Sequence, residues 1–274
     1  MDLNAKTLPP MPLTMEGSWV LHQMIRFDWA AWRGVPPETA ETMVADFAAM
    51  FDKIGSDKSA FFSLVGHKGD FMAVHFRPRF DDLNDAEVAV TKSALGDFMD
   101  VVHSYVSVVE LGLYESSVKV YQALLERNVE PHTEPWNKEI ADTIERQRAA
   151  MAGRLFPDIP PARYICFYPM DRRRGEQKNW YMLPIQERQR QMHEHGMVGR
   201  RYAGEVRQII TGSTGFDNWE WGVTLFAEEP LVFKKLIYEM RFDEVSAMYA
   251  EFGEFFTGIR RQTSELAALL AIAE

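Results

Sequence analysis

Cysteine is almost absent from this sequence, since Cys166 is the only one among 274 residues. A single cysteine excludes an intrachain disulfide and a zinc site built from thiolates. Because Cys166 lies in an apolar, strand-like segment, we expect a buried thiol with a structural role. The chain also has no Walker loop, no GxGxxG turn after a strand and no GxSxG elbow. Nothing in it therefore indicates these nucleotide-binding or hydrolase sites.

Long apolar runs and an excess of positive charge are lacking as well. No apolar stretch approaches the ~18 residues that a membrane-spanning helix needs, and the first residues lack the basic and apolar regions of a secretory signal. We therefore expect a cytoplasmic protein without a membrane span. The net charge of −10 disfavours nucleic acid as a partner. Arginines are nevertheless clustered at Arg172–Arg174 and Arg200–Arg201, which suits a small polyanionic ligand.

The two halves of the chain show the same order of expected elements, which is the main clue to the architecture. In the first half we expect strands at Ser18–Phe27, Ala60–Val65, Phe71–Arg77 and Ser104–Leu111, and helices at Pro36–Ile54 and Asn84–Met99. In the second half we expect strands at Arg163–Met170, Tyr202–Thr211, Trp219–Phe226 and Val245–Phe256, and helices at Pro184–His195 and Pro230–Met240, the former ended by Gly196. Each half thus reads βαββαβ, the ferredoxin-like unit.

Two such sheets joined edge to edge form an open β-barrel with external helices, an α+β fold. We therefore predict a ferredoxin-like half at residues 1–113, a linker at 114–161, a second ferredoxin-like half at 162–260 and a C-terminal helix at 261–274. The linker is polar and rich in proline, and its length is unusual for a connector. We expect one helix in it, Trp136–Met151, within a flexible or lid-like segment.

The segment Tyr164–Phe256 concentrates aromatic residues, arginines and histidines. A haem with propionate groups needs a histidine for its iron and basic residues for its carboxylates. This segment offers a histidine at a helix end and a basic turn, which lies beside a strand that carries the phenol of Tyr168. Since side chains alternate along a strand, Tyr168 shares a face with Cys166 and Met170, opposite Phe167. Such a tyrosine is either an oxidisable group beside a metal or a strand-edge residue with a solvated hydroxyl.

None of the seven histidines has HExxH spacing, and His193 and His195 point about 200° apart on a helix. A zinc site with several histidine ligands is therefore not expected. A haem needs only one axial histidine. His195 lies directly before Gly196, but periodicity does not choose between the two histidines, and a surface or capping role is the alternative for either.

Other polar residues near these segments have two interpretations each. Gln208 falls on the apolar face of the strand expected at Tyr202–Thr211. It is therefore either a buried structural amide or a residue that contacts a ligand. Arg241 and Ser246 flank the last helix-to-strand turn, and Arg154 precedes the second half. An arginine can pair with both oxygens of a carboxylate, so each of these arginines could bind a ligand carboxylate. The alternative for each is a solvated charge on the surface.

Several long strings carry a resemblance to a known family. They are CFYPM, NWYMLP, HGM.GR.YAG, QIITGS.GFD.WEWGV.LF and FKK..YEMRFDEVSA between Tyr164 and Gly258, with weaker matches at VGHKGDF and SYVSVVELG. In these strings the chain resembles the coproheme decarboxylases of the chlorite dismutase superfamily. The resemblance implies a cytoplasmic homopentamer of double ferredoxin-like subunits, each binding one porphyrin in its C-terminal half.

By position, the resemblance makes His195 the proximal iron ligand and Tyr168 the catalytic tyrosine. It places these residues around the propionates or in the distal pocket: Arg154, Met170, Gln208, Arg241 and Ser246. Gln208 stands where chlorite-degrading members have an arginine, which disfavours chlorite as the substrate. Arg172 stands where decarboxylases commonly have a lysine, and since a guanidinium keeps its proton, we expect a fixed cation there.

The chemistry that the resemblance implies starts with hydrogen peroxide, which oxidises the ferric porphyrin. The oxidised porphyrin takes an electron and a proton from Tyr168. The tyrosyl radical abstracts hydrogen from a propionate β-carbon, and loss of CO2 leaves a vinyl group. Two rounds convert Fe-coproporphyrin III (coproheme), both substrate and redox centre, to haem b. A coproporphyrin ferrochelatase is an expected partner. The alternatives are a haem-binding or haem-delivery protein without turnover, and a chlorite dismutase.

Overall fold

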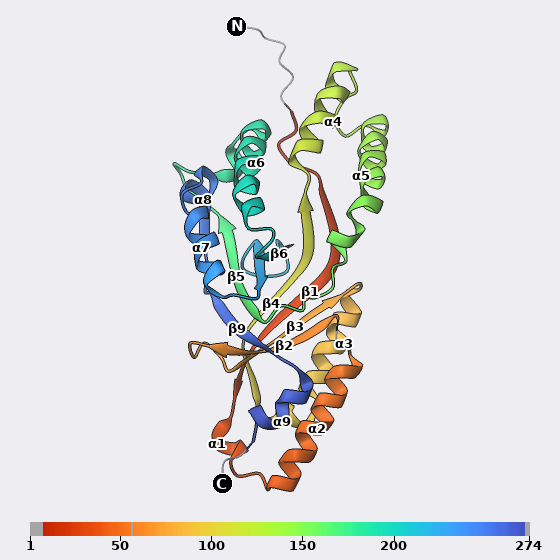
Figure 1. The fold of residues 1–274 in the computed structure, drawn as a ribbon. Coiled ribbons are helices and arrows are strands. Elements are labelled where there is room, and N and C mark those ends of the chain that lie inside the picture. Colours follow the sequence, from red (N-terminus) through yellow and green to blue (C-terminus); the bar gives the residue numbers. More distant parts are fainter. Residues whose placement is uncertain (1–7, 56, 272–274) are drawn as a thin grey trace.

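The computed structural model describes residues 8–55 and 57–271 (Figure 1). The N-terminal half contains β1 (Thr14–Phe27), α1 (Trp29–Trp32), α2 (Pro37–Lys53), β2 (Ser59–Val65), β3 (Phe71–Arg77), α3 (Phe80–Thr91) and β4 (Met99–Gly112). The C-terminal half contains β5 (Tyr164–Arg172), α6 (Ile185–Arg201), β6 (Arg207–Gly212), β7 (Trp221–Ala227), α7 (Leu231–Met240), α8 (Glu244–Tyr249), β8 (Ala250–Phe252) and β9 (Phe256–Arg261). Between the halves lie α4 (Tyr114–Glu126) and α5 (Glu134–Leu155), and α9 (Leu266–Leu269) follows β9. Short 3₁₀ helices are formed by Ala94–Phe98, Trp180–Met182 and Thr263–Glu265.

The strands form one sheet in the order β7-β6-β4-β1-β3-β2-β9-β5-β8, and β5 also pairs with β7, so the sheet closes into a ring. The two halves meet where β4 pairs with β6 and where β2 pairs with β9. Side chains from both halves fill the ring, including Phe62, Phe76, Phe167 and Phe226. The helices lie outside, with α2 and α3 at one end and α6, α7 and α8 at the other (Figure 1). The predicted α+β fold is confirmed.

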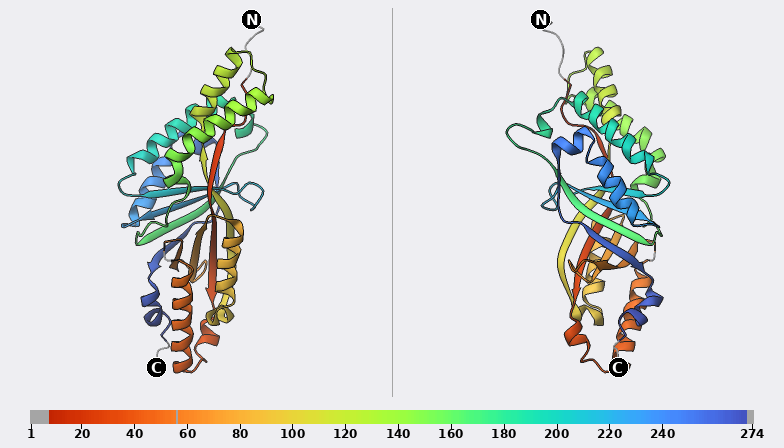
Figure 2. Two further views of the ribbon diagram at one scale, coloured as in Figure 1. Left: turned by 90° about the vertical axis from the view of Figure 1, so that its right-hand side faces the viewer. Right: turned by 60° about the vertical axis from the view of Figure 1, so that its left-hand side comes forward.

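The linker between the halves is a packed helical pair in place of the expected flexible segment. The predicted helix at Trp136–Met151 lies within α5, and α4 is a second helix that the sequence analysis did not predict. Tyr121 of α4 stacks on Trp136 of α5 with ring centroids 5.5 Å apart, and both share an apolar cluster with Ile185 at the start of α6. The pair projects at the end where the described chain begins (Figure 2). None of the helices in the described ranges is long and apolar enough to cross a membrane.

Two predicted boundaries near the C-terminal helices are wrong. The helix expected to end at Gly196 continues to Arg201, because one glycine inside a helix costs only about 1 kcal/mol and does not stop it. The strand expected at Val245–Phe256 is interrupted: α8 occupies its first part, and β8 and β9 follow. The helix forms there because the Asp243 carboxylate caps it, accepting a hydrogen bond from the Ser246 N–H at 2.8 Å.

Two other elements are shorter or shifted. The strand expected at Tyr202–Thr211 begins only at Arg207, because α6 runs on to Arg201 and a turn follows it. The helix expected at Asn84–Met99 begins earlier, at Phe80, and α-helix gives way to a 3₁₀ turn before Met99. These shifts leave the βαββαβ order of each half unchanged.

The N-terminal half contains two buried histidines, His22 inside the ring and His75 on its outer face. His22 stacks on Phe167 with ring centroids 4.0 Å apart, and its Nε2 lies 3.0 Å from the Thr224 hydroxyl. His75 places its Nδ1 2.8 Å from the Ser59 hydroxyl. Burial lowers the pKa of each imidazole from 6.5 to about 3. Both side chains are therefore neutral in the folded protein at neutral pH.

These histidines predict a loss of stability in acid. Below pH 6.5 the histidines of the unfolded chain bind protons that the folded chain excludes. Their contribution to the free energy of unfolding is therefore fully present above pH 6.5 and is lost as the pH falls to about 3. Between neutral pH and about pH 5, each histidine should remove roughly 2 kcal/mol from the free energy of unfolding. Urea unfolding at fixed protein concentration measures this, and His75→Gln should show a shallower pH dependence. Identical pH dependence in both proteins would contradict the assignment.

Candidate functional site

Strand β5 separates the ring interior from the candidate site. Ile165 and Phe167 point into the ring. Cys166 and Tyr168 point to the other face, where they pack with side chains of α7 such as Phe233. The alternation predicted from the sequence is confirmed, as is the burial of Cys166, which is only 2% exposed. Burial raises the pKa of that thiol to about 12, so it carries its proton.

Tyr168 is held between aromatic rings. Phe255 stacks on it with ring centroids 4.5 Å apart, and Phe252 lies at 5.8 Å. Within residues 8–55 and 57–271 its hydroxyl forms no hydrogen bond. Burial raises the pKa of the phenol, against the opposing charges of Arg241 and Arg172. Tyr168 is thus a neutral, buried phenol close to two guanidinium groups.

Arg172 is a buried cation that forms no salt bridge within the described part of the chain. Its side chain is 7% exposed, its guanidinium lies 5.2 Å from the Trp180 ring centre, and Nη2 lies 3.6 Å from the Met192 sulfur. Nη1 is buried and has no partner in the described part of the chain. Burial accordingly lowers the pKa of the guanidinium. Because an unpaired buried charge is costly, this geometry favours an anionic ligand.

Arg241 is the second guanidinium beside Tyr168. It follows the last turn of α7, and its guanidinium stacks 3.8 Å from the Phe252 ring centre. Phe252 belongs to β8, which pairs with the end of β5, where Met170 faces Phe252. Among the described residues no carboxylate pairs with Arg241. The stacking holds the guanidinium by its face, which leaves its N–H groups available to a carboxylate.

His195 lies inside α6, and a carboxylate at the start of α8 orients it. Its Nδ1 lies 2.8 Å from Asp243 Oδ2, and the Ser246 hydroxyl donates to the same oxygen at 3.2 Å. Burial acts to raise the pKa of Asp243, but hydrogen bonds from His195 and the Ser246 N–H bring it below its usual value. With Nδ1 engaged, Nε2 is the nitrogen left for a metal.

The sequence analysis missed Asp243, although its position three residues before Ser246 is a helix-capping pattern. Nothing in the sequence indicates that the same carboxylate contacts a histidine 48 residues away. His193, the other candidate, is exposed and lies in a polar surface cleft with Glu115 and Arg190. The structure thus separates the two histidines by their surroundings.

Gln208 reaches from β6 toward the helices. Its amide nitrogen lies close to Gly199 of α6. A Cβ added at Gly199 would lie 3.3 Å from this nitrogen and 3.3 Å from the methyl carbon of Met240. Ile210 shares this face of β6 with Gln208, as predicted, but it is 39% exposed, whereas the buried Ile209 points into the ring. Gln208 is therefore half-buried between strand and helices, on the same side of the sheet as Tyr168.

The structure brings most of the predicted site residues to one region. Tyr168, Met170 and Arg172 share one face of β5, with Arg241 beside them. Arg154 is not brought to this group in any described contact: it is exposed at the end of α5, where its Nη1 lies 3.8 Å from the Met151 sulfur.

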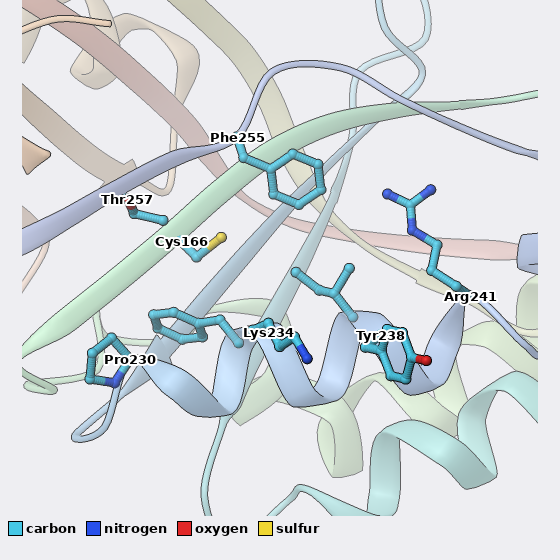
Figure 3. Close-up of a pocket in the computed structure, with 9 residues that line it drawn as sticks. Cys166, Pro230, Lys234, Tyr238, Arg241, Phe255 and Thr257 are labelled. Carbon is cyan, nitrogen blue, oxygen red and sulfur yellow. The ribbon is translucent and has the colours of Figure 1, made fainter. Parts of the chain in front are cut away.

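A cleft of about 480 Å³ opens next to Tyr168, within the size range of small-molecule sites. Figure 3 shows it between α7 on one side and Cys166, Phe255 and Thr257 on the other. Arg241 and Lys234 add positive charge to an otherwise apolar lining. Tyr168, His195 and Gln208 do not line this cleft, but Phe255, which stacks on the phenol, does.

Two ferredoxin-like halves that close one sheet into a ring, with the helices outside, define an α+β barrel protein. The chain belongs to the chlorite dismutase family, whose sequence model matches residues 40–261. A coproheme decarboxylase from Staphylococcus saprophyticus is 42% identical over 260 residues, which cover 92% of this chain and 94% of that protein. The family predicted from the sequence is confirmed.

Solved structures agree with this assignment. A haem-binding protein from Thermus thermophilus is 38% identical and superimposes with a TM-score of 0.81, covering 97% of this chain and 99% of that one. A variant chlorite dismutase from Candidatus Nitrospira defluvii is 17% identical, with a TM-score of 0.70 over 95% of this chain and 98% of that one. At that identity, the second structure supports the fold alone.

Proposed function

We propose that this protein is a coproheme decarboxylase, which converts two propionate groups of Fe-coproporphyrin III to vinyl groups and yields haem b. The similarity to the coproheme decarboxylase of Staphylococcus saprophyticus over nearly the whole chain supports this activity. One observation of the site carries the proposal furthest: Tyr168 is a buried, neutral phenol close to Arg172 and Arg241, which have no carboxylate partners among the described residues.

The substrate fits the donors that these residues offer. Coproheme carries propionates at several positions of its ring, and a propionate at Arg172 would supply the acceptor that Nη1 lacks. A second propionate would pair with Arg241. His195 would bind the iron through Nε2, while Asp243 fixes the tautomer through Nδ1. Ser246 supports this contact through Asp243.

Other contacts are proposed from the resemblance. Met170 and Gln208 would border the distal face of the porphyrin, since both lie on the sheet face that Tyr168 occupies. Gln208 offers a neutral amide there. Arg154 would be a further propionate contact.

The reaction proceeds by loss of hydrogen from Tyr168. Bound coproheme and hydrogen peroxide supply the oxidising power, and peroxide is reduced to water. The Tyr168 hydroxyl gives up one electron and one proton, and the resulting phenoxyl radical takes a hydrogen atom from the propionate β-carbon, which restores the phenol. A second electron then leaves the substrate as its carbon–carboxylate bond breaks, giving CO2 and the vinyl group. Each propionate thus consumes one peroxide.

We further propose that the protein is a cytoplasmic homopentamer that receives coproheme from a coproporphyrin ferrochelatase. Membership of the family and the resemblance of the site strings support this assembly and this source of substrate. The molecular mass in solution, measured by light scattering, tests the assembly.

Mass spectrometry of the coproheme complex after stepwise addition of peroxide tests the activity. Loss of two carboxyl groups from the porphyrin, with haem b as the end product, is the expected result. A protein that only carries haem would bind coproheme and show bleaching of the porphyrin without decarboxylated products.

Arg172 is expected to act as a fixed cation. Arg172→Ala removes a charged hydrogen bond worth roughly 1.5–3 kcal/mol. Coproheme binding should then weaken by about 10- to 150-fold, or turnover should stop at the monovinyl intermediate. Arg172→Lys keeps the charge and should retain activity. Absorbance titration measures binding, and chromatography measures the intermediate.

Arg174→Ala is the matched control, because Arg174 lies two residues after Arg172 but is exposed and faces Glu220 at 3.6 Å. It should bind and turn over coproheme like the parent. If Arg172→Ala also behaved like the parent, a propionate contact at this residue would be refuted.

A further inference from the structure

A loop of the N-terminal half reaches the site in the C-terminal half. Between β2 and β3 the chain reads Gly66-His67-Lys68-Gly69-Asp70, and Lys68 Nζ donates a hydrogen bond to the backbone oxygen of Phe255 at 2.9 Å. Sequence separation gives no hint of this contact, because the two residues lie 187 positions apart. The loop belongs to the VGHKGDF string, and the proposed reaction assigns it no role.

The base of this loop is firmly fixed. Gly66 has φ of 106°, a conformation that favours glycine. The Asp70 carboxylate accepts hydrogen bonds from the Phe27 N–H at 2.8 Å and from the Trp29 indole at 3.0 Å. Lys68 is therefore presented from an anchored loop, although its own side chain is exposed.

The segment that Lys68 contacts consists of residues 253–255, here termed the connector, which joins β8 to β9. Gly253 donates to the Pro169 oxygen at 2.9 Å, and a Cβ at this position would lie 2.7 Å from the Pro169 ring. The connector therefore packs directly on the residue that follows Tyr168. A second contact from the N-terminal half joins His103 and Glu254, at 3.6 Å.

Phe255 contacts both Tyr168 and the cleft. Its ring stacks on Tyr168 at a centroid distance of 4.5 Å, with 25° between the planes. The same side chain lines the cleft, opposite α7 and near Arg241 (Figure 3). Phe255 thus links the phenol to the lining of the cleft.

We propose that Phe255 and Lys68 are positioning residues for the reaction of Tyr168, an inference that rests on the proposed function. Phe255 fixes the plane of the phenol and shields it from water in the cleft, and Lys68 holds the connector in place from the other half of the chain. Hydrogen-atom transfer depends steeply on the placement of the donor, and displacements of about 1 Å can cost about 100-fold in rate. Shielding also limits side reactions of a radical.

The test compares Lys68→Met, Lys68→Arg and Phe255→Leu with the parent, and uses Lys92→Met, at an exposed lysine after α3, as the control. We expect Lys68→Met and Phe255→Leu to bind coproheme like the parent, because Arg172, Arg241 and His195 are unchanged. The rate of the first decarboxylation should fall by about 10- to 100-fold. Lys68→Arg should restore most of it, and Lys92→Met should match the parent.

Electron paramagnetic resonance adds a readout that a purely structural role would not move. The splitting of a tyrosyl radical by its β-protons depends on the torsion of the ring, so the line shape in Phe255→Leu and Lys68→Met should differ from that of the parent. Parental rates and line shapes in both variants would overturn the inference. So would a result in which the main defect of the two variants is weaker binding of coproheme. A parent that forms no haem b would instead overturn the proposed function. Should Phe255→Leu not fold, the exposed Lys68 still provides the test.

Discussion

The Tyr168→Phe variant should bind coproheme and release almost no CO2 when peroxide is added. The substitution removes only the hydroxyl, so the stacking on Phe255 remains, and no hydrogen bond is lost among the described residues. Because phenylalanine nearly conserves the volume, stability should change little. Chromatography of the porphyrins after peroxide addition measures the outcome, and the parent should yield haem b under the same conditions.

Tyr164→Phe is the matched control for this result. Tyr164 lies four positions earlier on the same face of β5, and its hydroxyl contacts only Arg163, at 3.3 Å, in the described structure. This variant should form haem b like the parent. Haem b formed by Tyr168→Phe at close to the parental rate would remove the radical mechanism and leave Tyr168 as a packing residue.

The fold could be predicted from the sequence because two periodic signals act over long segments. The alternation along β5 predicted that Tyr168 and Phe167 point to opposite faces, and the structure has Phe167 in the ring and Tyr168 on the helical side. The repeated order of elements indicated the two ferredoxin-like halves. The predicted ends of helices and strands were wrong where a single residue decides them. The helix α6 continues through Gly196, and Asp243 starts a helix where a strand was expected.

The candidate site was predictable only in part, for a physical reason. Tyr168 and Met170 lie on the predicted strand, so their common face follows from alternation. Arg172 was expected in the turn that follows, but it is the last residue of β5. The groups that orient the site come from distant parts of the chain: Asp243 reaches His195, and Lys68 reaches Phe255. Such contacts depend on how the halves close into a ring, and neither propensity nor spacing encodes them.

His195 is favoured by one feature of the sequence and by a different feature of the structure. The sequence favoured it through the family resemblance of the HGM string and through its place before Gly196, at an expected helix end that does not exist. The structure supports it through Asp243, whose carboxylate holds Nδ1 and leaves Nε2 free. An imidazole that donates to a carboxylate is a stronger ligand for iron, and its orientation is fixed.

His195→Ala should therefore lose the spectrum of histidine-ligated ferric coproheme, while propionate contacts still allow weak binding. His193→Ala, at an exposed position two residues earlier on the same helix, should keep the parental spectrum. Asp243→Asn should retain the iron–histidine bond but lower its stretching frequency in the ferrous complex, because an amide accepts the Nδ1 proton less strongly. Loss of outer partners of this kind typically weakens metal affinity by about 10- to 100-fold. Resonance Raman spectroscopy measures the bond directly. A parental frequency in Asp243→Asn would show that Asp243 serves only as the cap of α8, and loss of the spectrum in His193→Ala alone would move the ligand to His193.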